Sequence, residues 1–246
     1  AKLKAEGIEK SDISREEFLE HAWEWKEKHG GIILEQLKKL GASCDWDRTK
    51  FTMDPEMSKS VINTFVHFYN KGLIYRGVRM VNWDPEGQTA VSDEEVIRKE
   101  TKSKLYHLKY FISENGLPSN NFIVVATTRP ETIMADSAVC IHPQDERYKH
   151  INGKKVFIPL INKEIPIIED EYVTMDFGTG CLKVTPAHDI NDYEIGLRHK
   201  LPVTDIIDKW GKLNEDAIIL VGTERFEARK QIVKMLSEKG FLEKEE

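Results

Sequence analysis

The chain has 246 residues, of which 40% are hydrophobic and 32% are charged, and its formal net charge is −6. This composition is ordinary for a soluble globular protein with more than one structural unit. The charges are spread evenly, which argues against a dedicated nucleic-acid-binding domain with a basic face, and no apolar run approaches the roughly 18 residues that a membrane span requires.

The first hundred residues carry mainly helical patterns. Ser14 and Glu17 form a capping box, and the helix that they begin is expected to end at Gly30-Gly31. Asp54-Pro55 supplies an N-cap and a first-turn proline for a later helix. In order, the expected elements are helices over residues 14–30, 33–40 and 54–72, a strand over 73–83, a turn over 84–87 and a short helix beginning at Ser92.

From about Thr101 the helical spacing gives way to the alternation that is typical of strands. Asn115-Gly116, between two such runs, is a hairpin signal. Strands are expected over residues 106–112, 122–128, 139–142, 156–161, 165–168, 180–185 and 203–207. So many short strands at close spacing predict a β-barrel with a few inserted helices.

A last helix is expected from Phe226 until Gly240, because apolar residues recur along one side of it. We therefore expect an α+β protein in three parts. These parts are a mainly helical connecting segment over residues 1–100, a β-barrel over 101–225, and a C-terminal helix over 226–246 that packs on the barrel.

A first polar motif, Ala126-Thr-Thr-Arg-Pro-Glu-Thr132, ends one of the expected buried strands. Its hydroxyl groups and free amides lie just before a helix start at Pro130, where they can bind a carboxylate, a carbonyl or a hydroxyl. A capped helix start without any ligand is the alternative interpretation.

A second motif runs from Asp176 to Tyr193 and follows the order loop, strand, turn, helix. Its two glycines, Gly178 and Gly180, permit positive φ or a close approach of the backbone to a ligand. A strand end beside a helix N-terminus suits a small polar ligand. The alternative is a polar turn that only caps the following helix.

Together the two motifs closely resemble the editing domain of valyl-tRNA synthetases, an insertion also called connective polypeptide 1. The resemblance covers essentially the whole chain and includes the segments Trp23–Lys26, Asp45–Arg48, Gly72–Arg76 and Arg225–Arg229. It implies an editing-domain β-barrel with inserted and flanking helices. Some members carry a C-x-x-C zinc motif where this chain has Asp84 and Gly87, so neither a metal nor a cofactor is expected.

The resemblance implies hydrolysis of the ester bond in threonyl-tRNA specific for valine. Threonine and valine have nearly the same shape, so an apolar synthetic pocket rejects threonine only weakly, and a second site must remove it. The implied partners are the acceptor end of valine tRNA carrying threonine and the rest of the synthetase chain. Neither Met57–Ser60 nor His150–Gly153 matches the ATP motifs of this class, so the synthetic site is expected outside this chain.

The resemblance also implies roles for four candidate catalytic residues. Asp192, with Asp189 beside it, is expected to meet the substrate ammonium. Lys183 and Thr185 lie two residues apart on a strand, point the same way, and are expected to bind the substrate hydroxyl or the terminal ribose. Alternatively, Asp189 only caps a helix, and Lys183 is a solvated strand lysine. Oriented water and charge stabilisation would suffice for hydrolysis of an activated ester.

A second set of candidates is expected to bind the substrate. Arg129 and Thr128 would hold carbonyl or phosphate oxygens. For His188, both a packing role and a general-base role are open. Cys181 with His188 invites a cysteine-hydrolase interpretation, but no partner that would activate the thiol is evident. The set comprises Thr127, Thr128, Arg129, Thr132, Gly178, Gly180 and His188.

Two other functions remain open at this stage. One is a module that binds the tRNA acceptor end without hydrolysis, and the other is a deacylase for a different misacylated amino acid. Three widely spaced cysteines favour neither a disulfide framework nor a zinc ribbon, so a reducing cytoplasm is the expected location. We expect a monomer that does not contact a membrane.

Overall fold

A computed structural model describes residues 2–9 and 12–246. Residues 1, 10 and 11, which fall in the expected first part, lie outside the described residues. The structure divides into two compact units, one ending at Gly77 and the other running from Val78 to Glu246. Residues 78–100 therefore belong to the same unit as the larger sheet. Our division into three parts, with a boundary near Thr101, stays a prediction.

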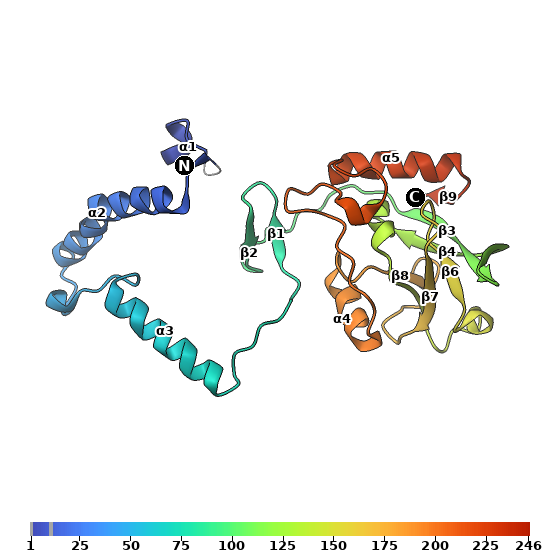
Figure 1. Cartoon of the computed structure of the whole chain (residues 1–246), viewed down its shortest axis with the longest axis horizontal. Helices are drawn as coiled ribbons and strands as arrows, with labels where there is room; N and C mark the ends of the chain where they lie inside the picture. The colour runs from blue at the N-terminus through green and yellow to red at the C-terminus, as the bar shows by residue number, and fades with distance from the viewer. Residues whose placement is uncertain (1, 10–11) are drawn as a thin grey trace. The chain divides into compact units, whose positions relative to one another are not determined.

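The first unit is helical, as expected. Its elements are α1 (Lys2–Ala5), α2 (Arg15–Lys39), the 3-10 turn η2 (Trp46–Arg48) and α3 (Pro55–Asn70) (Figure 1). The capping box is present, because the Glu17 amide donates to the Ser14 hydroxyl and the Ser14 amide donates to the Glu17 carboxylate. The expected break at Gly30-Gly31 is wrong. These glycines lie inside one continuous helix, since a glycine weakens a helix by about 1 kcal/mol without removing a hydrogen bond.

The second unit begins with a two-stranded ribbon of β1 (Asn82–Asp84) and β2 (Thr89–Val91). The strand expected over 73–83 is therefore confined to its last residues. In the connecting turn, both Asp84 carboxylate oxygens accept backbone amides, those of Glu86 and Gly87. The Ser92 amide donates to the Glu95 carboxylate, but this hydrogen bond closes a turn and does not begin the expected helix.

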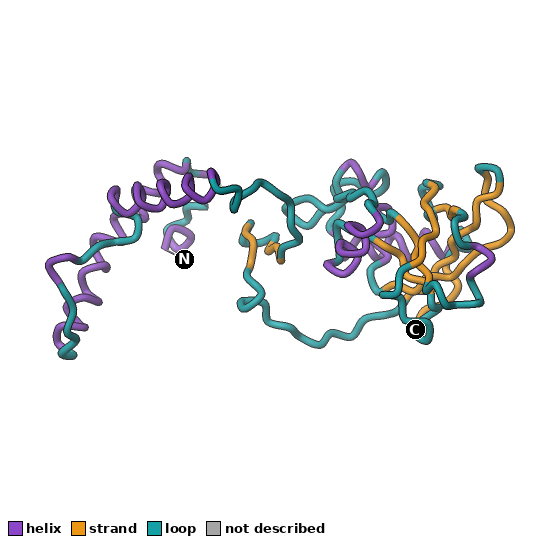
Figure 2. Tube along the Cα trace, turned by 90° about the horizontal axis from the view of Figure 1, so that it is seen from below, coloured by secondary structure: helices purple, strands orange, loops and turns teal. Residues whose placement is uncertain are grey.

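The larger sheet confirms the α+β fold class. Its strands are β3 (Tyr106–Glu114), β4 (Leu117–Thr127), β5 (Ala138–Ile141), β6 (Lys155–Phe157), β7 (Glu164–Glu169), β8 (Cys181–Val184) and β9 (Leu242–Glu245). Their order is β4-β3-β6-β7-β5-β8, with β9 on β3, and only the β5–β7 pair is parallel. The end strands β4 and β8 pack side by side, so the sheet curls into a barrel-like layer (Figure 2).

The turn between β3 and β4 is the expected hairpin, with positive φ at both Asn115 and Gly116. The strand expected over 203–207 is wrong, because only Ile207 forms an isolated bridge, to Leu213. Its neighbour Ile206 donates its amide to the His188 ring instead of to a strand. The amides of Ile206 and Ile207 are therefore satisfied by the side chains of His188 and Asp205.

Helical turns and helices surround the sheet. They are η3 (Pro130–Ala135), η4 (Lys149–Ile151), α4 (Ile190–His199), η5 (Glu215–Ala217) and α5 (Arg225–Glu238). Residues Ala228, Ile232 and Leu236 of α5 are fully buried in the main core with the strands. A smaller core lies where Ile195 of α4 packs on Val184 of β8. Within the part of the chain that the structure describes, no helix is long and apolar enough to cross a membrane.

Candidate functional site

The site is built where three chain segments converge. Strand β8 carries Lys183 and ends just before Thr185, and its ladder with β5 pairs Lys183 with Val139. Thr132 lies on η3, the turn that follows β4. Asp136 comes directly after η3 and two residues before β5. The two sequence motifs are thus brought together by the pairing of β8 with β5.

Lys183 lies at the centre of a buried polar cluster. Its ammonium donates to Oγ1 of Thr132 and to Oδ1 of Asp136, both at 3.1 Å, and also contacts the Thr185 hydroxyl. Thr185 Oγ1 donates to the same Asp136 oxygen at 2.6 Å. Lys183 is only 7% exposed, so the interpretation as a solvated strand lysine is wrong. Burying an ammonium is costly, and here hydrogen bonds to Thr132, Asp136 and Thr185 compensate it.

Asp136 was not among the residues that the sequence singled out. Its carboxylate is fully buried, and Oδ2 accepts from the Tyr110 hydroxyl at 2.5 Å. Burial raises the pKa of Asp136, while Lys183 and Thr185 oppose that shift by favouring the ionised form. The one available signal was an aspartate inside the apolar run that follows the first motif. Such a residue is expected to be buried with partners.

Asp192 approaches the cluster from the first turn of α4. Its Oδ2 accepts the Thr185 amide at 2.8 Å, and the residue is 7% exposed. Burial raises the pKa of Asp192 to about 6, and the Thr185 amide and the Lys183 ammonium lower it in part. A second buried carboxylate, ionised near neutral pH, therefore lies beside Lys183 and Thr185.

Asp189 is the N-cap of α4, as the alternative interpretation proposed. Its Oδ1 accepts the amides of Asn191 at 2.8 Å and Asp192 at 3.2 Å, and the residue is exposed. It therefore fixes the helix turn that presents Asp192.

Arg129 links the first motif to the second. Its amide donates to Thr127 Oγ1 at 3.0 Å, and its carbonyl oxygen accepts from the Thr132 hydroxyl at 2.9 Å. Its Nη1 donates to the carbonyl oxygen of His188 at 2.6 Å. Thr127 and Thr132 are buried, whereas Thr128 is exposed and lies outside these contacts. The loop is thus tied to the turn before α4.

His188 is a neutral packing residue in this geometry. Burial, Arg129 and Lys183 together lower its pKa to about 4. Its Nε2 accepts the Ile206 amide at 3.2 Å, so the ring proton is on Nδ1. The Asp205 carboxylate at 3.8 Å from Nε2 is then no ion pair. Because the lone pair is engaged, a packing role is favoured over a general-base role.

The two glycines of the second motif do not join the Lys183 cluster. Gly178 (φ +58°) lies beside Ala126 of β4, and Gly180 (φ +76°) leaves no room for a side chain next to Arg147. Gly178 and Gly180 line a hollow of about 320 Å³ together with Leu182. Leu182 faces the opposite side of β8 from Lys183, because neighbouring strand residues alternate.

Cys181 does not support the cysteine-hydrolase interpretation. Its thiol is buried, and burial raises its pKa to about 11, which leaves almost no thiolate at neutral pH.

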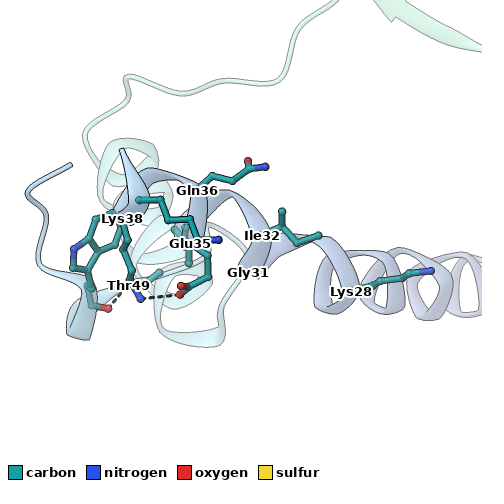
Figure 3. Close-up of a pocket in the computed structure, with 10 residues that line it drawn as sticks. Lys28, Gly31, Ile32, Glu35, Gln36, Lys38 and Thr49 are labelled. Atoms are coloured by element: carbon teal, nitrogen blue, oxygen red, sulfur yellow. Dashed lines mark hydrogen bonds and ion pairs between the residues drawn. The ribbon is translucent and has the colours of Figure 1, made fainter. Parts of the chain in front are cut away.

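Two larger hollows are present in the described chain. One of about 690 Å³ in the first unit is lined by α2 and residues 46–49, where Lys38 pairs with Glu35 at 3.0 Å (Figure 3). Its lining side chains are exposed or half-buried and include no buried polar group, so we assign it no chemistry. The other, about 610 Å³, adjoins Arg129 and His188 and is also lined by Trp83, Lys209 and Arg225, among others. It therefore offers access next to the first motif.

Comparisons with known proteins cover the whole chain. Valine–tRNA ligases of Bacteroides thetaiotaomicron and Parabacteroides distasonis are each 61% identical, and that of Pelagibacter ubique is 53% identical. Each match covers 100% of this chain and 28% of the relative, so the chain spans under a third of these proteins.

Two solved structures are similar at a distance. "The crystal structure of GlLeuRS-CP1" aligns with a TM-score of 0.45 and 12% identity, covering 56% of this chain and 97% of that one. A ternary complex of Agrobacterium radiobacter LeuRS with tRNA and LeuAMS aligns with a TM-score of 0.46 and 19% identity, covering 86% of this chain and 35% of that one. Likeness at this level supports no functional conclusion. The model of class I tRNA synthetases (I, L, M and V) matches residues 1–237, and the chain belongs to that family.

Proposed function

We propose that this chain carries the editing site of a valyl-tRNA synthetase and hydrolyses the ester of threonine wrongly joined to valine tRNA. The observation that carries the proposal is the buried cluster of Lys183, Thr185, Asp136 and Thr132 beside Asp192. It unites both sequence motifs around groups that recognise a hydroxyl and an ammonium.

A hydroxyl-bearing substrate fits the polar side chains of this cluster. Lys183, Thr185 and Thr132 offer donors and acceptors in a buried setting. Threonine can exchange hydrogen bonds with them, whereas valine would place a methyl group against buried polar atoms. These groups already have protein partners, so the difference lies in the additional hydrogen bond that a threonine hydroxyl can donate to Thr132 or Thr185 and that valine lacks. This asymmetry supports threonine as the substrate.

Asp192 is our choice for the partner of the substrate ammonium. One of its oxygens already accepts the Thr185 amide, and we assign the ammonium to the other. Above a pH of about 6 the carboxylate is ionised and can form a charge-assisted hydrogen bond.

The proposed hydrolysis uses water as the nucleophile. The water oxygen adds to the ester carbonyl carbon, the bond from that carbon to the ribose oxygen breaks, and a proton passes to the ribose oxygen. Free threonine and uncharged tRNA result. The inert thiol of Cys181 and the engaged ring of His188 support a mechanism without a protein nucleophile. Nearby cations would stabilise the developing oxyanion.

The implied partners are the acceptor end of valine tRNA and the rest of the synthetase. The hollow beside Arg129 supports the first, because Lys209 and Arg225 on its lining would attract phosphate. The length of the relatives supports the second. A monomer in the cytoplasm remains our expectation.

The decisive experiment is a deacylation assay of the full-length protein with preformed threonyl-tRNA. We expect release of threonine, with valyl-tRNA as a control that stays intact. Release of neither amino acid would favour a binding module without hydrolysis. Faster release from tRNA carrying another amino acid would keep the enzyme class and replace the substrate.

A further inference from the structure

The first motif contains a buried carboxylate that the proposed chemistry does not use. Glu131 on η3 has a side chain that is 1% exposed. Arg229 of α5 donates its Nε to Oε2 at 2.8 Å and its Nη2 to Oε1 at 2.7 Å. A single guanidinium group therefore engages both oxygens of this carboxylate.

A second guanidinium group forms a longer ion pair with the same carboxylate and no hydrogen bond to it. Arg129 Nε is 3.7 Å from Glu131 Oε1, beyond hydrogen-bonding distance. The Arg129 guanidinium donates instead to the carbonyl oxygen of His188 at 2.6 Å, across the gap between the two motifs. Arg129 thus lies between two acceptors, one in each motif.

We propose that Arg229 is a positioning residue for the site: by occupying both oxygens of Glu131 it keeps the Arg129 guanidinium on the carbonyl oxygen of His188, which holds the two motifs together. The consequence for hydrolysis rests on the function proposed above. A buried carboxylate without a partner is strongly unfavourable. When Arg229 is removed, the nearest cation is Arg129, which then turns to Glu131 and releases His188.

The proposal distinguishes a single variant from a double variant in the full-length protein. Arg229→Ala is expected to lower kcat for threonyl-tRNA roughly 10- to 100-fold with a smaller change in KM, because small misplacements of a site cost this much. Arg229→Ala/Glu131→Gln is expected to recover most of that loss, since a neutral amide no longer attracts Arg129. A salt bridge with a purely structural role would lower the free energy of unfolding in Arg229→Ala and restore it in the double variant, while kcat of the folded protein would stay unchanged in both.

Lys234→Ala is the matched control on the same helix. The Lys234 side chain is 77% exposed, and its replacement is expected to leave both kcat and KM unchanged. If Arg229→Ala does not fold, Arg229→Lys replaces it. One ammonium cannot hold both carboxylate oxygens as a guanidinium fork does, so an intermediate loss is expected that Glu131→Gln again relieves.

Hydrogen–deuterium exchange provides a readout that does not depend on hydrolysis. Amides in segments 127–135 and 185–190 are expected to exchange faster in Arg229→Ala and to return toward the unsubstituted rate in the double variant. If the unsubstituted protein fails to hydrolyse threonyl-tRNA, the proposed function fails, while exchange still tests the positioning role. A double variant at least as impaired as Arg229→Ala, or an Arg229→Ala variant that behaves like Lys234→Ala, overturns the proposal.

Discussion

Two buried carboxylates with different surroundings define the chemistry at the scale of single residues. The Asp136 carboxylate accepts hydrogen bonds from Lys183, Thr185 and Tyr110, whereas the Asp192 carboxylate accepts one from the Thr185 amide. A carboxylate that is held from several sides serves to place its partners. One with remaining acceptor capacity is suited to meet a ligand.

The pH dependence of hydrolysis should report Asp192. Its pKa of about 6 lies above that of an ordinary aspartate because the residue is buried. The ionised form, which binds the ammonium, is therefore lost as the pH falls through 6, and kcat/KM for threonyl-tRNA is expected to drop with it. The measurement is a pH profile from 5 to 8, corrected for spontaneous ester hydrolysis.

Asp192→Asn tests the same assignment. Loss of the charged partner is expected to cost roughly 2–4 kcal/mol of transition-state binding and to remove the step near pH 6. A variant with unchanged rates, or with the same pH profile, would contradict the role of Asp192.

Asp136 is expected to be essential for stability. In Asp136→Ala the Lys183 ammonium stays buried without its carboxylate, which should destabilise the chain by roughly 3–5 kcal/mol. The measurement is urea denaturation of the 246-residue chain. Asp136→Leu/Lys183→Met is the control, and it should be less destabilised than Asp136→Ala because neither charge remains. Equal free energies of unfolding for Asp136→Ala and the unsubstituted chain would contradict this prediction.

At the scale of elements, helices α4 and α5 and strand β8 serve different purposes. Helix α4 presents Asp192 from its first turn, with Asp189 as the cap. Strand β8 delivers Lys183 to the inside, and α5 supports η3 from behind through Arg229. Each element thus contributes one polar side chain to the site or to the turn that supports it.

The continuity of α2 leads to a prediction for two glycines. Gly30→Ala and Gly31→Ala should each stabilise the helix by about 0.5–1 kcal/mol, because a Cβ meets Lys26 Cγ only at 3.8 Å at the first site and nothing within 4 Å at the second. Circular dichroism during thermal unfolding measures the change. Gly41→Ala, at φ +79°, is the opposite control and should destabilise. Loss of stability at Gly30 and Gly31 would favour the break that the sequence suggested.

Sequence patterns predicted the elements whose signals are local. The capping box at Ser14, the Asn115-Gly116 hairpin and the cap of α4 depend on neighbouring residues, and all are present. The continuity of α2 depends on how little two glycines destabilise a helix that can form on both sides of them. The absence of a strand over 203–207 depends on a partner distant in the sequence, the ring of His188.

The site was partly predictable for the same reason. Lys183, Thr185 and Thr132 stand in recognisable motifs and meet in space. Asp136 was not identified because its role arises only when the β5–β8 pairing brings Lys183 to it. Gly178 was grouped with the site by sequence proximity, although it lies in the turn before β8 and lines a hollow with Leu182, which faces away from Lys183.

At the scale of the whole molecule, the two units differ in how much they bury. Among the described residues, every buried side chain lies beyond residue 106. Helices α2 and α3 contain no buried residue, and apolar side chains of α3 such as Val61, Ile62 and Phe65 are more than half exposed. The stability of this chain therefore resides in the second unit.

Residues 78–246 alone are expected to fold. This fragment keeps the full set of buried residues, so it should unfold cooperatively with a midpoint within a few degrees of that of the 246-residue chain. Residues 1–77 alone should unfold gradually, because their helices lack a core. Calorimetry of the two fragments makes the comparison. A sharp transition in the first fragment, or none in the second, would refute it.

The pairing of β9 with β3 also places the two borders of the barrel, just before β3 and just after β9, side by side. Leu105 and Glu246 exchange two backbone hydrogen bonds, at 2.8 and 2.9 Å, so the two borders of the barrel are neighbours. A module with such adjacent attachment points can be gained, lost or exchanged during evolution without forcing apart the segments on either side of it.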